Sequence, residues 1–518
     1  MSTNTYTDFY SVVSQNSKIN PKKVVIFEDD LKITNEQLLE SVDSVASYLQ
    51  SYGIKSGDKV AILMSNSWQY IVNIFAINKI GGVIVLINNF LKEDEIAHIL
   101  NDSQSKLLFA SAKFAAEVSQ QIIKSTIQTI VWVDGLPHSN EKNKPYTDLI
   151  SVKVNTASYV KLAIDELALI IYTSGTTGKP KGAMLSFKNI NSNVTSCAKH
   201  LKVKDKMPMV AYLPMFHAFT LTVTIMLPLM CNSSITVIRS IATKGDFANL
   251  LKQVLLKRVR YFAGVPDVYS ALSKAKLPWY FHWFHNVKGF ISGAAPLAEE
   301  TMRKFDASFK KGKLIQGYGI SECSPVVSVN QPWSNKIGSV GTPLFGYQVE
   351  CFDEDMNQVA RGETGEICVK GDCVMMGYYN RPQDTAESIV DGWFRTGDIG
   401  KVDKDGFIFI LDRKKDLIIN KGMNIYPREI EEIVYTNDKV NACAVVGLRD
   451  LEASETPVAY IELKEDAQAT ESEFKEFMKG KLAPFKQPRK FIFIDKLPRN
   501  ATGKILKREI RDILNAGN

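Results

Sequence analysis

The sequence predicts an α/β protein with three parts. They are a large N-terminal body of mixed and parallel sheets covered by helices, a β-rich subdomain, and a small α+β domain at the C-terminus. The first observation is size, because 518 residues with 45% hydrophobic and 23% charged residues allow several domains with a sizeable core. The second is a series of short apolar runs alternating with helical stretches, which is typical of parallel sheets covered on both faces. The third is a change after Thr342 to shorter strands separated by Gly and Asp turns.

The first clear helix is predicted from a capping box, Thr34-Asn-Glu-Gln37, in which each side chain can bond the other residue's backbone N–H. Apolar residues recur at helical spacing from Leu38 to Leu49, and Gly53 can end the helix. Continuous apolar runs then predict the buried strands of the body. These runs are Lys59–Leu63, Gly82–Ile87, Leu107–Ala110, Thr129–Val133, Leu167–Thr173, Val210–Leu213, Ile235–Ile238, Tyr261–Val265, Phe290–Ser292 and Leu314–Gln316.

A β-rich subdomain is predicted from about Thr342 to Leu411, and the charged run Asp412–Asp416 interrupts the apolar pattern after it. We therefore divide the chain into a body (1–411), a break (412–416) and a C-terminal domain (417–518). The last part is predicted to contain helix Pro427–Tyr435, strands Ala442–Gly447 and Val458–Leu463, a helix near Glu471–Leu482 and strand Phe491–Ile494.

The charge is spread unevenly along the chain. A net charge of +7 is weak for 518 residues and does not argue for nucleic acid as a partner. From Lys479 onward, however, eleven basic residues face three acidic ones, a local excess of +8. We expect this segment to meet the phosphates of small ligands, with an acidic membrane surface as a second partner. The sequence leaves the oligomeric state open.

Cysteine and histidine spacing argues against a metal or disulfide scaffold. The seven cysteines form no C-x-x-C pair, and buried free thiols are the expected state. His282 and His285 lack partners at metal-ligand spacing, so we expect them to pack. The N-terminus lacks the pattern of a signal peptide, and no apolar run reaches about 18 residues, so we expect a cytoplasmic protein.

The strongest local signal is a loop after the strand Leu167–Thr173, with the sequence Tyr172-Thr-Ser-Gly-Thr-Thr-Gly-Lys-Pro-Lys-Gly182. Glycines let backbone N–H groups approach an anion, and hydroxyl and ammonium groups add donors and charge, so the loop predicts polyphosphate binding. The Walker A spacing fails, because Thr173 stands where a first glycine is needed and Pro180 follows Lys179. The expected phosphate ligands are Thr173, Ser174, Gly175, Thr176, Thr177, Gly178, Lys179 and Lys181.

This loop closely resembles the signature of the adenylate-forming acyl-activating superfamily, and further motifs follow in the family's order across nearly the whole chain. The resemblance, to the fatty-acid–CoA ligase branch in particular, implies a two-step reaction. A carboxylate attacks the α-phosphate of ATP to give an acyl-adenylate and pyrophosphate, and the thiol of coenzyme A then displaces AMP. It also implies Mg²⁺ as a cofactor and a mobile C-terminal domain that turns about a hinge at 412–416.

Two motifs resemble the family's adenine and metal sites. In Gly317-Tyr-Gly-Ile-Ser-Glu322, Tyr318 can stack on a purine and the Glu322 carboxylate can hold Mg²⁺ on phosphate oxygens. Ser321 replaces the family's usual threonine and keeps the hydroxyl. Ser292-Gly-Ala-Ala-Pro296 resembles the turn beside the adenine and the acyl carbonyl. The expected ligands are Gly293, Ala294, Ala295, Gly317, Tyr318, Gly319 and Ser321.

Further motifs carry the expected catalytic charges. Asp398, which ends Gly392-Trp-Phe-Arg-Thr-Gly-Asp, matches the family's ribose-binding carboxylate, and Arg413 matches a residue that reaches the ribose and α-phosphate. Lys415 falls on the hinge position, and Gly422 on the loop that lines the pantetheine tunnel. Lys504, at the end of Pro498-Arg-Asn-Ala-Thr-Gly-Lys, matches the adenylation lysine.

The acid is predicted from Tyr212-Leu-Pro-Met-Phe-His-Ala-Phe219, which resembles a segment of fatty and aryl acyl-CoA synthetases. His217 stands where amino-acid-activating relatives have an aspartate, so we favour a medium- or long-chain fatty acid, with aryl acids second. We expect His217 to act as a lid of the acyl pocket, and a core histidine is the alternative. For the function, the alternatives are a carrier protein as acyl acceptor and a catalytically silent binding protein. The apolar neighbours expected around the acyl group are Phe216, Phe219, Leu221, Phe262, Val265 and Ala294.

Overall fold

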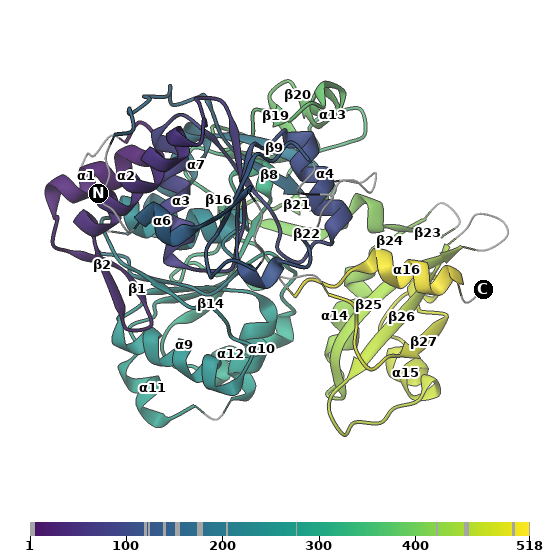
Figure 1. The fold of residues 1–518 in the computed structure, drawn as a ribbon. Helices are drawn as coiled ribbons and strands as arrows, with labels where there is room; N and C mark the ends of the chain where they lie inside the picture. Colours follow the sequence, from purple (N-terminus) through teal and green to yellow (C-terminus); the bar gives the residue numbers. More distant parts are fainter. Residues whose placement is uncertain are drawn as a thin grey trace.

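The computed structural model of the chain describes residues 6–118, 122, 125–137, 141–150, 156–173, 180–203, 206–275, 277–420, 423–449, 455–499 and 503–516. Within these residues the predicted α/β class is confirmed. A large body of mixed sheets and helices is followed by a β-rich subdomain and a small C-terminal domain, which lies beside the body in Figure 1. No helix among the described residues is both long and apolar enough to cross a membrane.

The largest sheet has eight strands in the order β19-β9-β8-β4-β3-β5-β6-β7. Its pairs are parallel from β8 to β7, as the apolar runs predict, while β9 and β19 add antiparallel pairs at one edge. The bounds are β3 (Lys59–Leu63), β4 (Val83–Leu86), β5 (Leu107–Ala110), β6 (Thr129–Trp132), β7 (Asn143–Pro145), β8 (Leu167–Thr173), β9 (Lys181–Ser186) and β19 (Gly377–Tyr378).

Two further sheets complete the body. One runs β12-β13-β14-β15-β16, and its first three strands are parallel. The other runs β10-β11-β1-β2 and includes an N-terminal hairpin that the sequence analysis did not predict. The bounds are β1 (Val24–Glu28), β2 (Leu31–Thr34), β10 (Met209–Ala211), β11 (Ile235–Val237), β12 (Tyr261–Gly264), β13 (Gly289–Ser292), β14 (Lys313–Gly319), β15 (Val326–Val329) and β16 (Thr342–Pro343).

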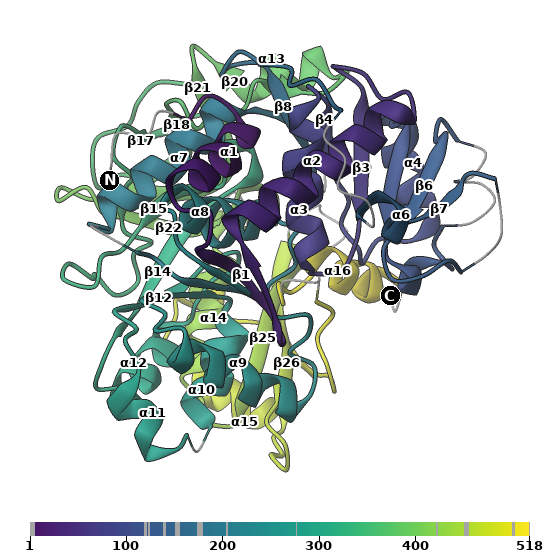
Figure 2. The same ribbon diagram turned by 60° about the vertical axis from the view of Figure 1, so that its left-hand side comes forward.

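The predicted capping box opens helix α2, where Thr34 Oγ1 accepts from the N–H of Gln37 at 3.2 Å and Gln37 Oε1 accepts from the N–H of Thr34 at 2.9 Å. Helices α9 to α12 gather beside the β12–β16 sheet (Figures 1 and 2). The helices are α1 (Phe9–Ile19), α2 (Asn35–Ser51), α3 (Trp68–Lys79), α4 (Glu93–Ser103), α6 (Tyr146–Ile150), α7 (Phe187–His200), α8 (Leu227–Met230), α9 (Lys244–Leu256), α10 (Pro266–Lys274), α11 (Trp279–Phe284), α12 (Glu299–Ser308) and α13 (Pro382–Ser388), with 3₁₀ turns η1 (Ala112–Phe114) and η3 (Ser321–Cys323) and a π-helix η2 (Thr220–Met226).

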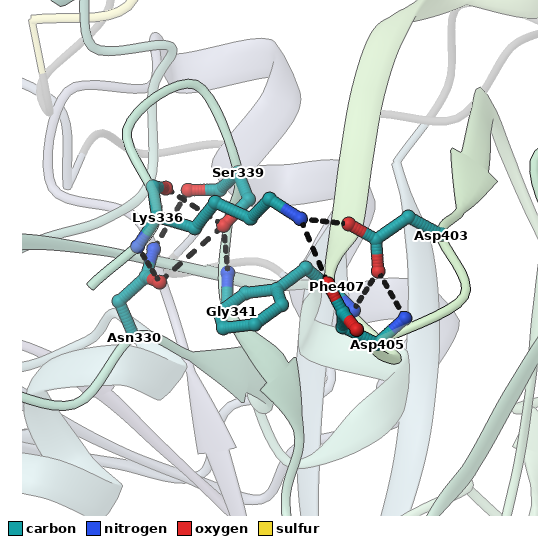
Figure 3. Close-up of polar contacts among 7 residues, drawn as sticks. All are labelled: Asn330, Lys336, Ser339, Gly341, Asp403, Asp405 and Phe407. Atoms are coloured by element: carbon teal, nitrogen blue, oxygen red, sulfur yellow. Dashed lines mark hydrogen bonds and ion pairs between the residues drawn. The ribbon is translucent and has the colours of Figure 1, made fainter. Parts of the chain in front are cut away.

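The β-rich subdomain appears where the Gly and Asp turns predict it. Its β21–β22 hairpin is tied to the body by Lys336, whose Nζ lies 2.5 Å from Asp403 Oδ2 and 3.3 Å from Asp405 Oδ2 (Figure 3). Asn330 Oδ1 in turn accepts from the backbone N–H of Lys336 at 3.1 Å. The strands are β17 (Gln348–Phe352), β18 (Gly365–Lys370), β20 (Ile389–Val390), β21 (Trp393–Val402) and β22 (Ile408–Arg413).

The C-terminal domain has its own cores. Described residues from Ile418 onward form two hydrophobic clusters, and those up to Ile408 form two others. Helix α15 is shorter than predicted because Gly480 takes a positive φ of 73°, and α16 was not predicted. The elements are η4 (Lys414–Asp416), β23 (Ile418–Asn420), β24 (Met423–Ile425), α14 (Pro427–Tyr435), β25 (Val440–Arg449), β26 (Glu455–Leu463), α15 (Glu471–Met478), η5 (Pro484–Lys486), β27 (Lys490–Phe493) and α16 (Lys507–Ala516).

Candidate active site

A cavity of about 1000 Å³ lies where the body meets the C-terminal domain. Its walls come from the ends of β8, β13 and β14, from the β21–β22 hairpin, from η4 and from Lys504. Ligands of α/β sheets bind beyond the carboxyl ends of the strands, which is the position of this cavity. Charged and hydroxyl groups line one part. The other part, which we call the apolar wall, is formed by Cys197, Leu201, Phe216, Phe219, Val223 and Leu227.

Asp398 and Arg413 form an ion pair because they face each other across the β21–β22 ladder. Arg413 Nε lies 3.0 Å from Asp398 Oδ1, and the hydroxyl of Tyr318 donates to Asp398 Oδ2 at 2.6 Å. Burial, followed by the Asp398 charge, raises the pKa of Tyr318 well above its ordinary value, so the phenol stays protonated. Tyr318 and Arg413 line the cavity, while Asp398 is 2% exposed and is not among the described lining residues.

Glu322 lies where the end of β8 meets the turn after β14. Its Oε1 accepts from Thr173 Oγ1 and from the hydroxyl of Tyr378, each at 3.1 Å. Mg²⁺ is usually held through one or two carboxylates together with substrate phosphates. An oxygen-only donor set with one carboxylate beside a phosphate-type loop therefore fits that ion. No group of three or more His, Cys, Asp or Glu residues that could hold a metal occurs in the part of the chain that the structure describes.

The predicted adenine turns need small residues. A Cβ on Gly319 would lie 1.9 Å from the carbonyl oxygen of Pro325, so only glycine fits there. Ala294 takes a positive φ of 66°, an uncommon conformation for a residue with a Cβ that concentrates at functional sites. Gly293, Ala294, Gly317, Gly319 and Ser321 all line the cavity, and Ala295 is not among the described lining residues.

The phosphate-type loop is described only at its two ends. Thr173 lines the cavity, as does Lys181, whose Nζ pairs with Asp384 Oδ1 on α13 and lies 5.5 Å from the ring centroid of Tyr378. The other predicted ligands lie outside the described residues: Ser174, Gly175, Thr176, Thr177, Gly178, Lys179 and the tunnel residue Gly422.

Lys504 brings the C-terminal domain into the cavity. It lines the wall together with Arg413 and Lys415. Burial and the neighbouring Arg413 lower the pKa of Lys504 to about 8, while the charges of Asp398 and Asp416 oppose the shift. Lys415 belongs to the turn η4, and partial desolvation of its ammonium, followed by the charge of Arg413, lowers its pKa as well.

His217 lines the cavity beside Phe216 and Phe219 and is uncharged near neutral pH, because burial lowers its pKa to about 4. Its Nδ1 accepts from the backbone N–H of Phe219 at 3.3 Å, which places the proton of the neutral ring on Nε2. Ala294 also lines the cavity. The other expected neighbours Leu221, Phe262 and Val265 are buried in the core and are not among the described lining residues.

The basic C-terminal segment (479–518) has less unneutralised positive charge than its local excess of +8 implies. Five of its eleven basic residues pair with carboxylates that precede the segment, which leaves little concentrated charge for a broad anionic surface. The pairs are Lys479–Glu476 at 3.3 Å, Lys486–Glu429 at 2.7 Å, Arg499–Glu462 at 2.9 Å, Lys507–Glu431 at 2.8 Å and Arg511–Asp416 at 2.5 Å.

Sequence reasoning missed three cavity groups. Tyr378 and Asp384 reach the site from β19 and α13, and no local pattern distinguishes them. Glu366 on β18 accepts from Arg395 at 2.8 Å and from the N–H of Gly397 at 3.1 Å. Arg395 and Gly397 lie inside the motif that ends at Asp398. The arginine at position 395 was a signal that a buried carboxylate, here Glu366, pairs with this motif.

Comparison with known proteins agrees with this geometry. Residues 13–379 match the AMP-binding enzyme family, and residues 429–504 match the AMP-binding enzyme C-terminal domain. A long-chain-fatty-acid–CoA ligase of Bacillus subtilis (strain 168) is 34% identical over 96% of this chain and 93% of its own length. The 4-coumarate–CoA ligase 1 of Solanum tuberosum is 31% identical over 91% of this chain and 87% of its own.

Solved structures give the same result. A crystal structure of ATP-bound MatB from Rhodopseudomonas palustris matches with a TM-score of 0.89 at 28% identity and covers 98% of both chains. The family match alone spans well over half of this chain. The chain therefore belongs to the AMP-binding enzyme family and is an adenylate-forming acid–thiol ligase.

Proposed function

We propose that this enzyme activates a medium- or long-chain fatty acid with ATP and transfers the acyl group to coenzyme A. In the first step a carboxylate oxygen bonds to the α-phosphorus, and pyrophosphate leaves. In the second, the thiol sulfur bonds to the acyl carbon, AMP leaves, and the thiol proton passes to solvent. The observation that carries the proposal is one cavity that joins an apolar wall to a cluster of Glu322, Arg413 and Lys504.

The nucleotide is assigned to the polar part of the cavity. Tyr318 stacks on the adenine. Asp398 is buried beside Tyr318 and Arg413, so it accepts the ribose hydroxyls when these two side chains move apart. The loop from Thr173 to Lys181 holds the phosphates. Lys181 leaves its ion pair with Asp384 and binds a phosphate oxygen instead. Glu322 would hold Mg²⁺, which neutralises phosphate charge when bound.

Positioning and charge carry the adenylation step in this proposal. The ammonium group of Lys504 and the guanidinium of Arg413 meet negative charge as it builds on the α-phosphate and carboxylate oxygens. Both side chains are half-buried, which strengthens that interaction because solvent screens it less than at an open surface.

The thioester step is assigned to a second domain arrangement. The C-terminal domain (417–518) turns about residues 412–416 relative to the body (1–411), with Lys415 as the hinge and Gly422 beside the pantetheine arm. The separate hydrophobic cores on either side of the hinge support this division.

The acyl group is assigned to the apolar wall. Neutral His217 supplies no fixed negative charge for a substrate ammonium, which argues against amino acids. The wall extends from Phe216 to Leu227 on α8 and to Cys197 on α7, so it presents several apolar side chains to a hydrocarbon chain.

An acid panel tests the substrate. Saturated fatty acids of graded length and aryl acids, assayed by ATP–pyrophosphate exchange, should show the highest kcat/KM for medium or long chains. Mass spectrometry should then detect the acyl thioester with coenzyme A as the sole acceptor. Preference for aryl acids, or a thioester only on a carrier protein, would select one of the alternatives. Cytoplasmic location and membrane contact through the basic C-terminal segment stay predictions.

A further inference from the structure

Helix α11 exposes four aromatic side chains on one short element. Trp279 is 71% exposed, Trp283 69%, Phe284 66% and Tyr280 47%. Only Phe281 is buried, with its ring 5.5 Å from that of His285. His282 packs on Phe309 at 5.3 Å, so both histidines pack as predicted. Large aromatics rarely remain in water together, and such a patch marks a contact surface.

Lysines lie beside this aromatic patch. Residues 277–298 and 307–316 contain four lysines (Lys288, Lys310, Lys311 and Lys313) and no acidic residue. The fold brings the two stretches together, because β13 pairs with β14 and Lys311 Nζ donates to the carbonyl oxygen of Trp283 at 2.5 Å. Lys288 and Lys310 are exposed. Asp306 on α12 comes just before the second stretch. Its carboxylate lies 3.7 Å from the ammonium of Lys313 and offsets that one charge.

The aromatic patch is remote from the chemistry. Helix α11 precedes Gly289, the first residue of β13, whereas the cavity lies beyond Ser292 at the other end of that strand. Figures 1 and 2 both show α11 at an extremity of the body. A partner can therefore contact α11 without covering the cavity.

We infer that α11 docks the enzyme on a lipid bilayer with anionic headgroups. Tryptophan and tyrosine favour the boundary between headgroups and acyl chains, and phenylalanine adds apolar area there. Lysines around such a patch are attracted to anionic lipids, and acidic side chains would oppose the contact. The occupant is a bilayer because lysines predominate beside the aromatic side chains, a charge pattern complementary to an anionic surface. This inference goes beyond the proposed function and uses none of the cavity residues.

Vesicle binding by the full-length enzyme tests the inference. Co-sedimentation should be strong with phosphatidylcholine–phosphatidylglycerol vesicles and weak with phosphatidylcholine alone. Replacing both tryptophans (Trp279→Ser with Trp283→Ser) should weaken binding about tenfold or more. Charge reversal (Lys288→Glu with Lys310→Glu) should remove the preference for the anionic lipid, at about fivefold per lysine.

A matched control comes from another part of the body. Trp333 and Phe345 are 49% and 64% exposed, and each has a lysine ammonium 4.7 Å from its ring centroid. Trp333→Ser with Phe345→Ser should bind vesicles like the parent, and all three double variants should turn over a short water-soluble acid at the parental rate. The inference is overturned if the parent ignores anionic vesicles, if the control loses binding as much as the α11 variant, or if α11 instead holds two copies together in light scattering.

Discussion

At the scale of single residues, the pair of Asp398 and Arg413 shows how the ladder of a hairpin positions a ligand group. The two residues are opposite each other in β21 and β22, so their ion pair exists before any substrate binds. The pair therefore holds the Arg413 guanidinium at the cavity before the nucleotide arrives.

Asp398→Asn should raise the KM for ATP about tenfold or more. The substitution removes the carboxylate charge that pairs with Arg413, and it removes the charged acceptor for the ribose hydroxyls. Initial rates of ATP–pyrophosphate exchange measure the effect. Asp403→Asn is the matched control, since Asp403 pairs with partly exposed Lys336 outside the cavity. Equal KM values for the two variants would contradict the ribose role of Asp398.

The lowered pKa of Lys504 gives a pH dependence of adenylation. The ammonium form carries the proposed role and predominates below a pKa of about 8, so kcat/KM for ATP in the exchange reaction should fall as the pH rises through 8. An ordinary lysine, with a pKa of 10.5, would give a flat profile there. Lys504→Arg should be slower but should lose this decline, because guanidinium remains charged. A decline of the same midpoint in Lys504→Arg would assign it to another group.

At the scale of elements, the turn η4 connects two bodies that have separate cores. Lys415→Pro should leave adenylation within about threefold and slow thioester formation about tenfold or more, because proline fixes the φ angle that a hinge must change. The two half-reactions are measured separately, by pyrophosphate exchange and by reaction of preformed acyl-adenylate with coenzyme A. Lys415→Ala, which keeps the backbone free to turn, should retain more thioester formation than Lys415→Pro. Equal loss of both half-reactions would argue against domain rotation.

The apolar wall depends on α7 and on the π-helix η2, a type of element that is frequent at functional sites. Cys197→Trp should shorten the space for the acyl chain and lower kcat/KM for the longest accepted acid about tenfold or more relative to a shorter one. Near-isosteric Cys197→Ser should keep the parental preference, and thermal unfolding of both variants reports any cost of overpacking. An unchanged chain-length profile in a folded Cys197→Trp enzyme would place the acyl chain elsewhere.

At the scale of the whole molecule, the two domains meet closely around the loop that carries Lys504. A Cβ on Gly503 would lie 2.6 Å from Asp267 Oδ2 on α10, so glycine allows this approach. Lys274 on the same helix donates to Asn441 Oδ1 at 3.2 Å, and Glu432 Oε2 accepts from the N–H of Glu299 at 3.3 Å. These contacts are mostly polar, which suits an interface that forms and separates.

Much of this architecture was predictable because buried parallel strands are continuously apolar, and β3, β5 and β8 have the predicted bounds. The hairpin β1–β2 was missed because β2 has two exposed residues among its four and no apolar run.

Site motifs could be predicted where their residues are consecutive in the sequence, as around Glu322. The hydrogen bond of Tyr378 to Glu322 joins residues 56 positions apart, so it could be found only from the tertiary fold. The same holds for the ion pairs that neutralise the basic C-terminal segment.

The central claim is that one cavity performs adenylation with Lys504 supplied by the C-terminal domain. Its most direct test measures both half-reactions in the parent enzyme and in Lys504→Ala, with Lys496→Ala as an exposed control in the same domain. Lys504→Ala should lose pyrophosphate exchange by about 100-fold or more and should still convert supplied acyl-adenylate and coenzyme A to the thioester. Parental exchange rates in Lys504→Ala would contradict the account.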